Sequence, residues 1–396
     1  MKTPLRIILG AAWIGLLVVP FGGLKTAGYV ALAVLVGSVI FNALGVMKER
    51  GALSGVISAA KLFDELVHSF TAGRRKTVAV SVIMAFLLAL PIFANRYTLD
   101  LSTQTGIYII LALGLNIVVG QTGLLVFGYV AFYAVGAYTY AILSTAHGVG
   151  FWTVLPIAAI FAGICGLVLG APALRLRGDY LAIVTLGFGE ITRIVLNNWD
   201  SVTGGPNGIT GVKRPDLGAI GIFGGFQDLT HFYYLVLGLM VLTVVFVRRL
   251  NDSRIGRAWI AIREDEVAAE AMGINTFGLK LLAFSLGAMV AGLAGVFYVA
   301  KMGFVSPESF NFFESVIILC MIVLGGMGSI PGVILGAVAL YVLPEALREF
   351  QQYRMVVFGA ALVVIMIFKP EGFIGTRRRG IETAHGENEE RKPVAV

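Results

Sequence analysis

The feature that most constrains this chain is a series of long apolar blocks with few charged residues inside them. The blocks are about 16–22 residues long, the length that an α-helix needs to cross a hydrocarbon core about 30 Å thick. Only 13% of the 396 residues are charged, whereas a soluble domain carries about 25%. So few charges cannot cover a water-facing surface of this size, which excludes a soluble enzyme, a nucleic-acid-binding protein and a disordered chain. The sequence predicts an all-α polytopic membrane protein.

The blocks predict about ten transmembrane helices and one broken or re-entrant hairpin. The hairpin covers 315–343, because four glycines and a proline within 325–332 argue against a continuous helix. Lys2 and Arg6 before the first block also resemble the start of a signal peptide, but no suitable cleavage site follows, so we expect a retained first span. The predicted spans are 5–21, 28–46, 77–95, 105–119, 124–145, 152–172, 180–198, 231–247, 278–300 and 354–369.

The sequence contains no motif for catalysis, nucleotide binding or metal binding. A Walker A loop is absent, as are G-x-S-x-G and H-E-x-x-H. The two cysteines, Cys165 and Cys320, lie inside apolar segments and are expected to be small buried side chains. We therefore expect a chain that is not an enzyme, takes no cofactor or metal, and has a transporter's features.

A long charged loop at 248–277 separates two predicted spans. We expect a helix over 257–273, and acidic residues crowd the start of the part that carries its apolar stripe, where they complement the helix dipole: Glu264, Asp265 and Glu266. The helix either connects the spans in solvent or docks into a groove on a cytoplasmic partner, and the charge pattern leaves both open. Four apolar residues form a stripe on this helix, at i, i+1, i+4 and i+7: Val267, Ala268, Ala271 and Ile274.

This loop resembles the coupling loop of the permeases of branched-chain amino acid ABC importers. ABC importer permeases carry an E-A-A-x-x-x-G signature, and Val267-Ala268-Ala269-x-x-x-Gly273 matches it with Val in place of Glu. Glu266 stands one position earlier. The resemblance extends over roughly residues 104–372, and further stretches resemble the LivM-type subunit: 116–125, 174–191, 203–209, 304–307 and 323–328.

The resemblance implies an ABC importer permease fold and a transmembrane subunit of an ATP-driven importer of branched-chain amino acids. It implies four kinds of partner: a homologous permease subunit, two cytoplasmic ABC ATPase subunits, a periplasmic amino acid-binding protein and the lipid bilayer. A urea or short-chain amide permease of the same superfamily and an ion-coupled secondary transporter are the alternatives. The residues that the resemblance assigns to ATPase coupling are Arg257, Arg263, Glu264, Asp265, Glu266, Ala268, Ala269 and Gly273.

The placement of basic residues predicts the orientation in a bacterial inner membrane. Most of the 30 lysine and arginine residues fall on one side when both termini are placed in the cytoplasm, as the positive-inside rule requires. We expect two spans and a cytoplasmic linker in 1–76, the permease core in 77–376 and a disordered cytoplasmic tail in 377–396.

Two glycine-interrupted apolar stretches, 105–145 and 315–343, are candidates for a substrate pathway. Broken helices expose backbone groups that bind a polar substrate where they line a cavity. The glycines also fit a simpler role, close packing of helices. Uncharged donors and acceptors beside apolar surface suit a zwitterion with an apolar side chain. The predicted pathway residues are Asn116, Gln121, Thr122, Gly123, Glu190, Gly325, Gly326 and Gly328.

Two further features remain open. Glu190 lies near the middle of span 180–198, where a carboxylate is costly; it either pairs with Arg193, three residues on, or contacts substrate or relays protons. The turn-rich loop 199–230 is either a solvated connection or a docking surface for a substrate-binding protein, through Lys213 and Arg214.

Overall fold

The computed structural model describes residues 73–176, 178–215, 229–346, 359 and 372–374. The chain divides into two compact units, Met1–Met84 and Ala85–Val396, and the contacts below all lie within the second. Predicted spans 5–21 and 28–46, nearly all of span 354–369 and the tail 377–396 fall outside the described residues. The predicted boundary after residue 76 therefore stays a prediction.

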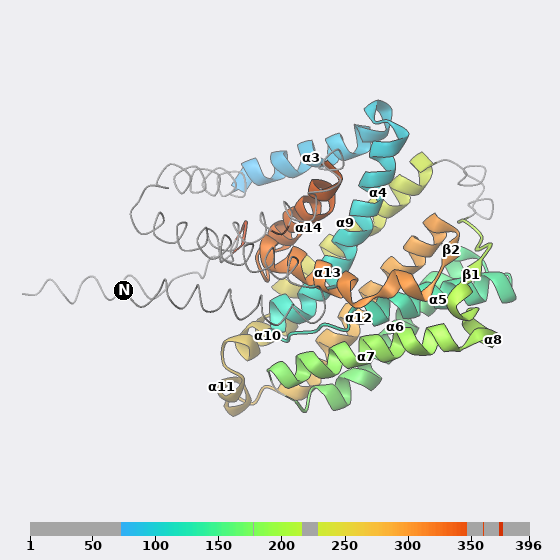
Figure 1. The fold of residues 1–396 in the computed structure, drawn as a ribbon. Coiled ribbons are helices and arrows are strands. Elements are labelled where there is room, and N and C mark those ends of the chain that lie inside the picture. Colours follow the sequence, from blue (N-terminus) through green and yellow to red (C-terminus); the bar gives the residue numbers. More distant parts are fainter. Residues whose placement is uncertain (1–72, 177, 216–228, 347–358, 360–371, 375–396) are drawn as a thin grey trace, which may run out of the picture. The chain divides into compact units, whose positions relative to one another are not determined.

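The described part is almost entirely helical (Figure 1). Two short strands, β1 (Ile209–Thr210) and β2 (Phe304–Val305), pair antiparallel with Ile209 opposite Val305. The helices are α3 (Gly73–Phe93), α4 (Arg96–Asn116), the π-helical turn η1 (Ile117–Gln121), α5 (Val130–Ala146), α6 (Phe151–Ala173), α7 (Asp179–Asn198), α8 (Asp200–Thr203), the 3-10 turn η2 (Gly205–Asn207), α9 (Leu229–Asp252), α10 (Arg254–Glu264), α11 (Glu266–Ala271), α12 (Thr276–Met302), the 3-10 turn η4 (Pro307–Phe310), α13 (Phe312–Gly325) and α14 (Ile330–Ala346).

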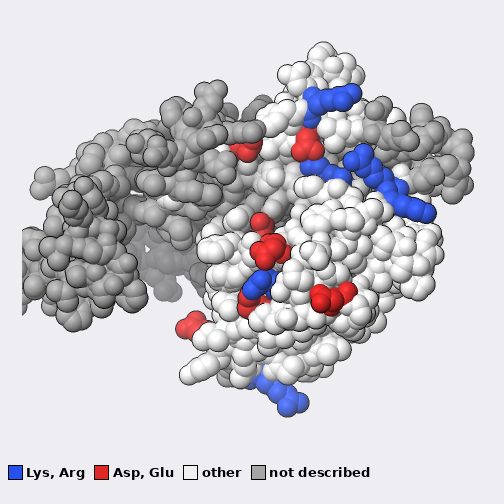
Figure 2. All heavy atoms as spheres, turned by 45° about the vertical axis from the view of Figure 1, so that its right-hand side comes forward, with Lys and Arg blue, Asp and Glu red and all other residues white. Residues whose placement is uncertain are grey.

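Four of these segments are long and apolar enough to cross a membrane: Arg96–Gln121, Phe151–Ala173, Leu229–Asp252 and Thr276–Met302. Shorter apolar helices include Val130–Ala146, Phe312–Gly325 and Ile330–Glu345. Figure 2 shows that most of the described surface in that view carries no charged side chain. The prediction of an all-α polytopic membrane protein is confirmed.

The core forms around α4 and α12. The most apolar windows of these helices are 94% and 72% buried, against 39% for α6 and 33% for α9. Small residues allow the backbones of α12 and α5 to approach each other. A Cβ atom on Gly295 of α12 would lie 2.3 Å from the carbonyl oxygen of Tyr133 of α5. Figure 1 shows α4 beside α9, a pair that also makes contact.

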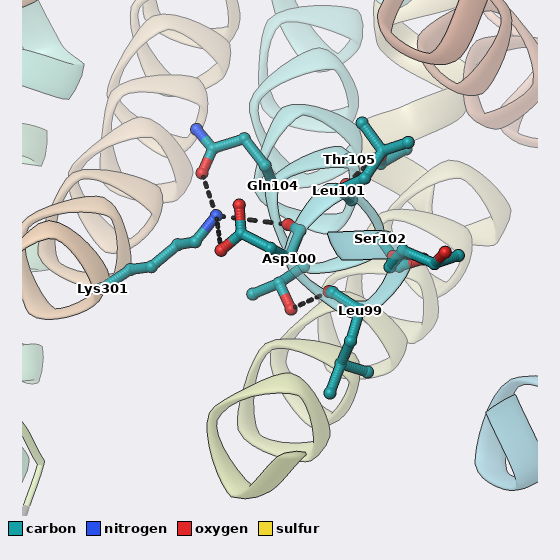
Figure 3. Close-up of polar contacts among 9 residues, drawn as sticks. Leu99, Asp100, Leu101, Ser102, Gln104, Thr105 and Lys301 are labelled. Atoms are coloured by element: carbon teal, nitrogen blue, oxygen red, sulfur yellow. Dashed lines mark hydrogen bonds and ion pairs between the residues drawn. The ribbon is translucent and has the colours of Figure 1, made fainter. Parts of the chain in front are cut away.

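A polar cluster joins the first turns of α4 to the last turn of α12 (Figure 3). Lys301 Nζ lies 3.0 Å from Asp100 Oδ1 and donates to Gln104 Oε1 at 3.0 Å and to the Asp100 carbonyl at 3.2 Å. The Lys301 side chain is only 7% exposed, so these oxygens replace the water that its ammonium loses.

The starts of two helices differ most from the expectation. The span expected at 105–119 starts at Arg96, because burial and Lys301 accommodate the polar residues of the first turns of α4. The span expected at 124–145 starts only at Val130, because residues 123–129 leave the helical conformation after η1.

Candidate functional site

The two broken segments meet in the structure. Asn116, at the end of α4, accepts a hydrogen bond of 2.9 Å at its Oδ1 from the backbone nitrogen of Gly328. Gln121, at the end of η1, donates from Nε2 to the Gly328 carbonyl at 3.4 Å. Asn116 is fully buried and Gln121 is 4% exposed. The contact made by Asn116, Gly120, Gln121 and Gly328 is called the joint below.

Gly120 is required for this approach. A Cβ atom there would lie 2.0 Å from Asn116 Oδ1 and 2.7 Å from the Gly328 nitrogen. The turn is π-helical, a form that occurs mostly as short segments and often at functional sites. It is followed by Thr122, whose Oγ1 donates to the Val118 carbonyl at 2.6 Å, and by Gly123, whose φ is 74°.

The second break lies between α13 and α14. Gly326 and Gly328 have φ of 112° and 86°, which reverses the chain within four residues. Gly325 serves packing instead, because a Cβ atom there would lie 2.3 Å from the Gly332 carbonyl oxygen. The expected broken hairpin is therefore present. Its glycines serve turn formation and helix contact, whereas their role in a substrate pathway stays a prediction.

One donor of the joint has no partner among the described residues. The Nδ2 atom of Asn116 is buried and makes no hydrogen bond there. A buried unpaired donor costs about 1–3 kcal/mol, so it is unusual in a helix that serves packing alone. Asn116 is thus the predicted pathway residue with the clearest unused binding capacity.

The charged loop forms two helices rather than the one expected over 257–273. Helix α10 ends at Glu264, and Asp265 caps α11 by accepting hydrogen bonds from Val267 N at 2.9 Å and Ala268 N at 3.0 Å. Its carboxylate therefore takes the N-cap position that interrupts the predicted helix. Segment 253–275, which contains both helices, is called the α10–α11 loop below.

One side of the α10–α11 loop is attached to α12. Trp259 is fully buried and donates from Nε1 to the Leu279 carbonyl at 2.8 Å. Lys280 Nζ lies 2.6 Å from Glu266 Oε2. Ala269 is also buried, which explains a small residue at that position of the signature.

The other side of the loop leaves apolar side chains exposed. Val267 is 69% exposed and Met272 is 83% exposed, and Ala268 and Ala271 lie beside them in the sequence and are exposed as well. Ile274, the last member of the predicted stripe, is half-buried. This apolar face continues with Met272, which helical periodicity alone did not select. The exposed charged residues of the loop include Arg257, Glu264 and Glu270.

Arg263 connects the two predicted sites. Its Nη1 atom donates to the Gly120 carbonyl at 2.5 Å. A Cβ atom on Gly123 would lie 3.1 Å from Arg263 Cγ, so the arginine stem passes directly over the turn that follows η1. The sequence assigned Arg263 to ATPase coupling and residues 121–123 to the pathway, and the structure places them in contact.

Glu190 pairs with Arg193 instead of joining this cluster. Arg193 Nε donates to Glu190 Oε1 at 2.9 Å, and the two side chains are 38% and 28% exposed for Glu190 and Arg193. This is the ion pair expected from their spacing. A contact of Glu190 with substrate stays a prediction.

Four polar residues near the breaks were not selected from the sequence. Thr185 Oγ1 on α7 and Ser315 Oγ on α13 accept from Phe127 N at 3.2 Å and Val130 N at 3.1 Å, and so hold the segment after η1. Tyr108 donates from its hydroxyl to Glu314 Oε2 at 2.8 Å. Glu314 lies in the first turn of α13, and the predicted hairpin began one residue later.

The loop after α7 is fixed by hydrogen bonds to distant parts of the chain. Val212 N donates to the Gly303 carbonyl at 3.2 Å, beside the β1–β2 pair, and the Tyr140 hydroxyl donates to the Lys213 carbonyl at 2.5 Å. These bonds hold the backbone while the side chains of Lys213 and Arg214 remain exposed. The geometry thus leaves two neighbouring cations available to a partner.

Comparison with known proteins identifies the family. The profile described as "Branched-chain amino acid transport system / permease component" matches residues 97–366. The high-affinity branched-chain amino acid transport system permease protein LivM of Escherichia coli K12 is 45% identical over 349 residues, which cover 83% of this chain and 82% of that protein.

More distant relatives include a second type of permease. The LivH permease protein of E. coli K12 is 28% identical over 289 residues, covering 68% of this chain and 91% of LivH. The probable LivM of Methanocaldococcus jannaschii is 27% identical over 322 residues, covering 68% of this chain and 90% of that protein. No solved structure matches the chain. This multi-pass membrane protein therefore belongs to the family of permease components of branched-chain amino acid transport systems.

Proposed function

We propose that this chain is the transmembrane permease subunit of an ATP-driven importer of branched-chain amino acids. The observation that carries the proposal is the 45% identity to the E. coli LivM permease over most of both chains. The chain itself performs no chemical reaction in this scheme. ATP hydrolysis belongs to separate cytoplasmic ATPase subunits, consistent with the absence of a Walker A loop from the sequence.

The exposed apolar face of α11, around Val267 and Met272 in the α10–α11 loop, is the surface that an ATPase subunit contacts. Its support is the exposure of these apolar side chains, which neighbouring charged residues border. Apolar helix faces of this kind bind into grooves on partner proteins. This assignment places the loop in the cytoplasm, in agreement with the positive-inside rule, because five arginines lie in the loop or just before it: Arg248, Arg249, Arg254, Arg257 and Arg263.

A second, homologous permease subunit completes the membrane part. Its support is the similarity of this chain to LivH, a permease protein of the E. coli high-affinity branched-chain amino acid transport system. A periplasmic binding protein delivers the amino acid on the opposite side, where Lys213 and Arg214 offer charges to acidic residues.

The substrate pathway passes the joint. Asn116 and Gln121 supply uncharged polar groups beside buried apolar residues, a composition that suits the zwitterionic head and apolar side chain of these amino acids. Access alternates when movement of the ATPase subunits displaces the α10–α11 loop and the helices that contact it.

The test is reconstitution of the complete transporter in proteoliposomes. Leucine with its binding protein is expected to stimulate ATP hydrolysis and to accumulate in the vesicles, whereas urea is expected to do neither. Accumulation of leucine without any ATPase subunit would favour the ion-coupled alternative. Stimulation by urea and not by leucine would favour the amide permease.

A further inference from the structure

The contact between Arg263 and Gly120 joins a solvent-exposed loop to a buried break. The carbonyl of Gly120 lies at the end of η1, where an N–H from a following helical turn is missing because residues 123–129 are not helical. The guanidinium of Arg263 supplies a donor to this carbonyl at 2.5 Å. The loop therefore caps the helical segment that forms one side of the joint.

Helix α10 holds Arg263 on a segment that buried side chains and a hydrogen bond attach to α12. Trp259 and Ile262 are 0% and 4% exposed, and Trp259 is bonded to the backbone of α12. Arg263 follows Ile262 directly and extends from the same helix toward η1. A displacement of α10 relative to η1 therefore changes the hydrogen bond that Arg263 donates to the Gly120 carbonyl.

The joint contains one hydrogen-bond donor that makes no hydrogen bond with the described residues. Gly328 is bonded through its nitrogen to Asn116 and through its carbonyl to Gln121, while the Asn116 Nδ2 donor has no partner among the described residues. A fully paired buried cluster can only lose hydrogen bonds when it moves. This cluster can gain one, which is a property expected of an element with two arrangements.

We propose that Arg263 is the positioning residue that transmits movement of the α10–α11 loop to the joint, so that the loop determines whether the two breaks stay together. The proposal rests on the proposed function, because it takes ATPase docking as the source of the movement. Arg263 touches neither substrate nor nucleotide in this scheme. Its effect is on the ratio between amino acid transported and ATP hydrolysed.

The experiment compares R263Q with R254Q in the complete transporter in proteoliposomes. Arg254 is the first residue of α10, is exposed, and lies outside the joint, so it is a matched loss of one positive charge. R263Q is expected to lower leucine uptake per ATP by about tenfold, within the usual range of coupling between sites. Its rate of ATP hydrolysis is expected to stay within about twofold of the wild type, because the docking face is intact. R254Q is expected to keep the wild-type ratio, and R263K, which retains a donor, is expected to lie between.

A double-variant cycle with Q121L tests whether Arg263 acts through the joint. If both residues act on one element, the losses in uptake per ATP do not multiply. The cycle uses R263K if R263Q lowers the yield of the complex. A wild-type ratio in R263Q, a proportional fall of uptake and hydrolysis, or multiplying losses in the cycle would overturn the proposal. Failure of the proposed function has a different signature, the lack of leucine-stimulated hydrolysis in the wild-type complex.

Discussion

The side-chain oxygen of Asn116 accepts a hydrogen bond from the backbone nitrogen of Gly328, 212 positions later in the chain. The bond joins the end of the most buried long helix to the turn of the α13–α14 hairpin. Helix α13 has 14 residues, or about 21 Å, and so is shorter than a hydrocarbon core about 30 Å thick. Asn116 is fully buried and Gly328 is half-buried, so the hydrogen bond between them satisfies backbone atoms that the interrupted helices leave unpaired.

Substitution of Gly120 by alanine is expected to disrupt the joint. The new methyl group would overlap Asn116 Oδ1 and the Gly328 backbone, and overpacking of this kind costs about 1–3 kcal/mol. Thermal unfolding of the purified protein in detergent measures the effect. Gly187→Ala in α7 is the control, because nothing lies within 4 Å of its Cβ position and helical alanine is favoured over glycine. An unchanged melting temperature for G120A would contradict the geometry.

Lys301→Met is expected to destabilise the contact between α4 and α12 more than Asp100→Asn does. The lysine side chain is 7% exposed, and its Nζ atom lies within 3.2 Å of three oxygen atoms. The Asp100 side chain is 56% exposed, so water can hydrate its carboxylate when the lysine is removed. Loss of a buried charged donor costs about 1.5–3 kcal/mol, and an exposed partner much less. Melting temperatures of the two variants check this, and equal shifts would contradict it.

The double variant V267D/M272D is expected to reduce binding of the ATPase subunit by about tenfold or more, because two charges would enter the apolar face. Co-purification and ATPase binding to permease in nanodiscs are the measurements. D252N, at the exposed last residue of α9 and outside the α10–α11 loop, is the control and is expected to bind normally. Undiminished binding by V267D/M272D would exclude this face as the docking surface.

Variants of Glu190 separate an ion pair from a substrate contact. E190L leaves Arg193 without its partner within α7, and an unpaired charge in a membrane span is costly, so the variant is expected to lower the yield of folded protein. The combined variant E190L/R193L removes both charges and is expected to restore the yield with wild-type uptake per complex. Restored yield without uptake would instead assign Glu190 a role in transport.

Reversal of the two exposed cations, K213E/R214E, is expected to weaken docking of the binding protein. A change of rim charges acts mainly on the association rate and on its salt dependence, so a decrease of about tenfold at low ionic strength is expected. Surface plasmon resonance with the nanodisc-embedded transporter measures the rate. Association that is unchanged at low salt would remove this loop from the docking surface.

Part of this outcome follows from local sequence properties. The length of the apolar blocks indicates the membrane class, and the positions of α6, α7 and α12 agree with the expected spans within two residues. The division of the coupling segment into α10 and α11 was missed, although Asp265 is a favourable N-cap residue. The Glu190–Arg193 pair was predictable because its spacing of three residues brings both side chains to one helix face.

The sequence by itself determined that this is a membrane protein and to which family it belongs, because the length of apolar blocks and short motifs are local properties of a chain. It also located the two breaks, since glycine and proline act on the backbone where they stand. Only the tertiary structure decided that the breaks meet at Gly328 and that Arg263 caps Gly120. It also decided that Thr185 and Ser315 hold the segment that follows η1. These contacts depend on how buried helices approach one another, which side-chain volumes across the whole core determine.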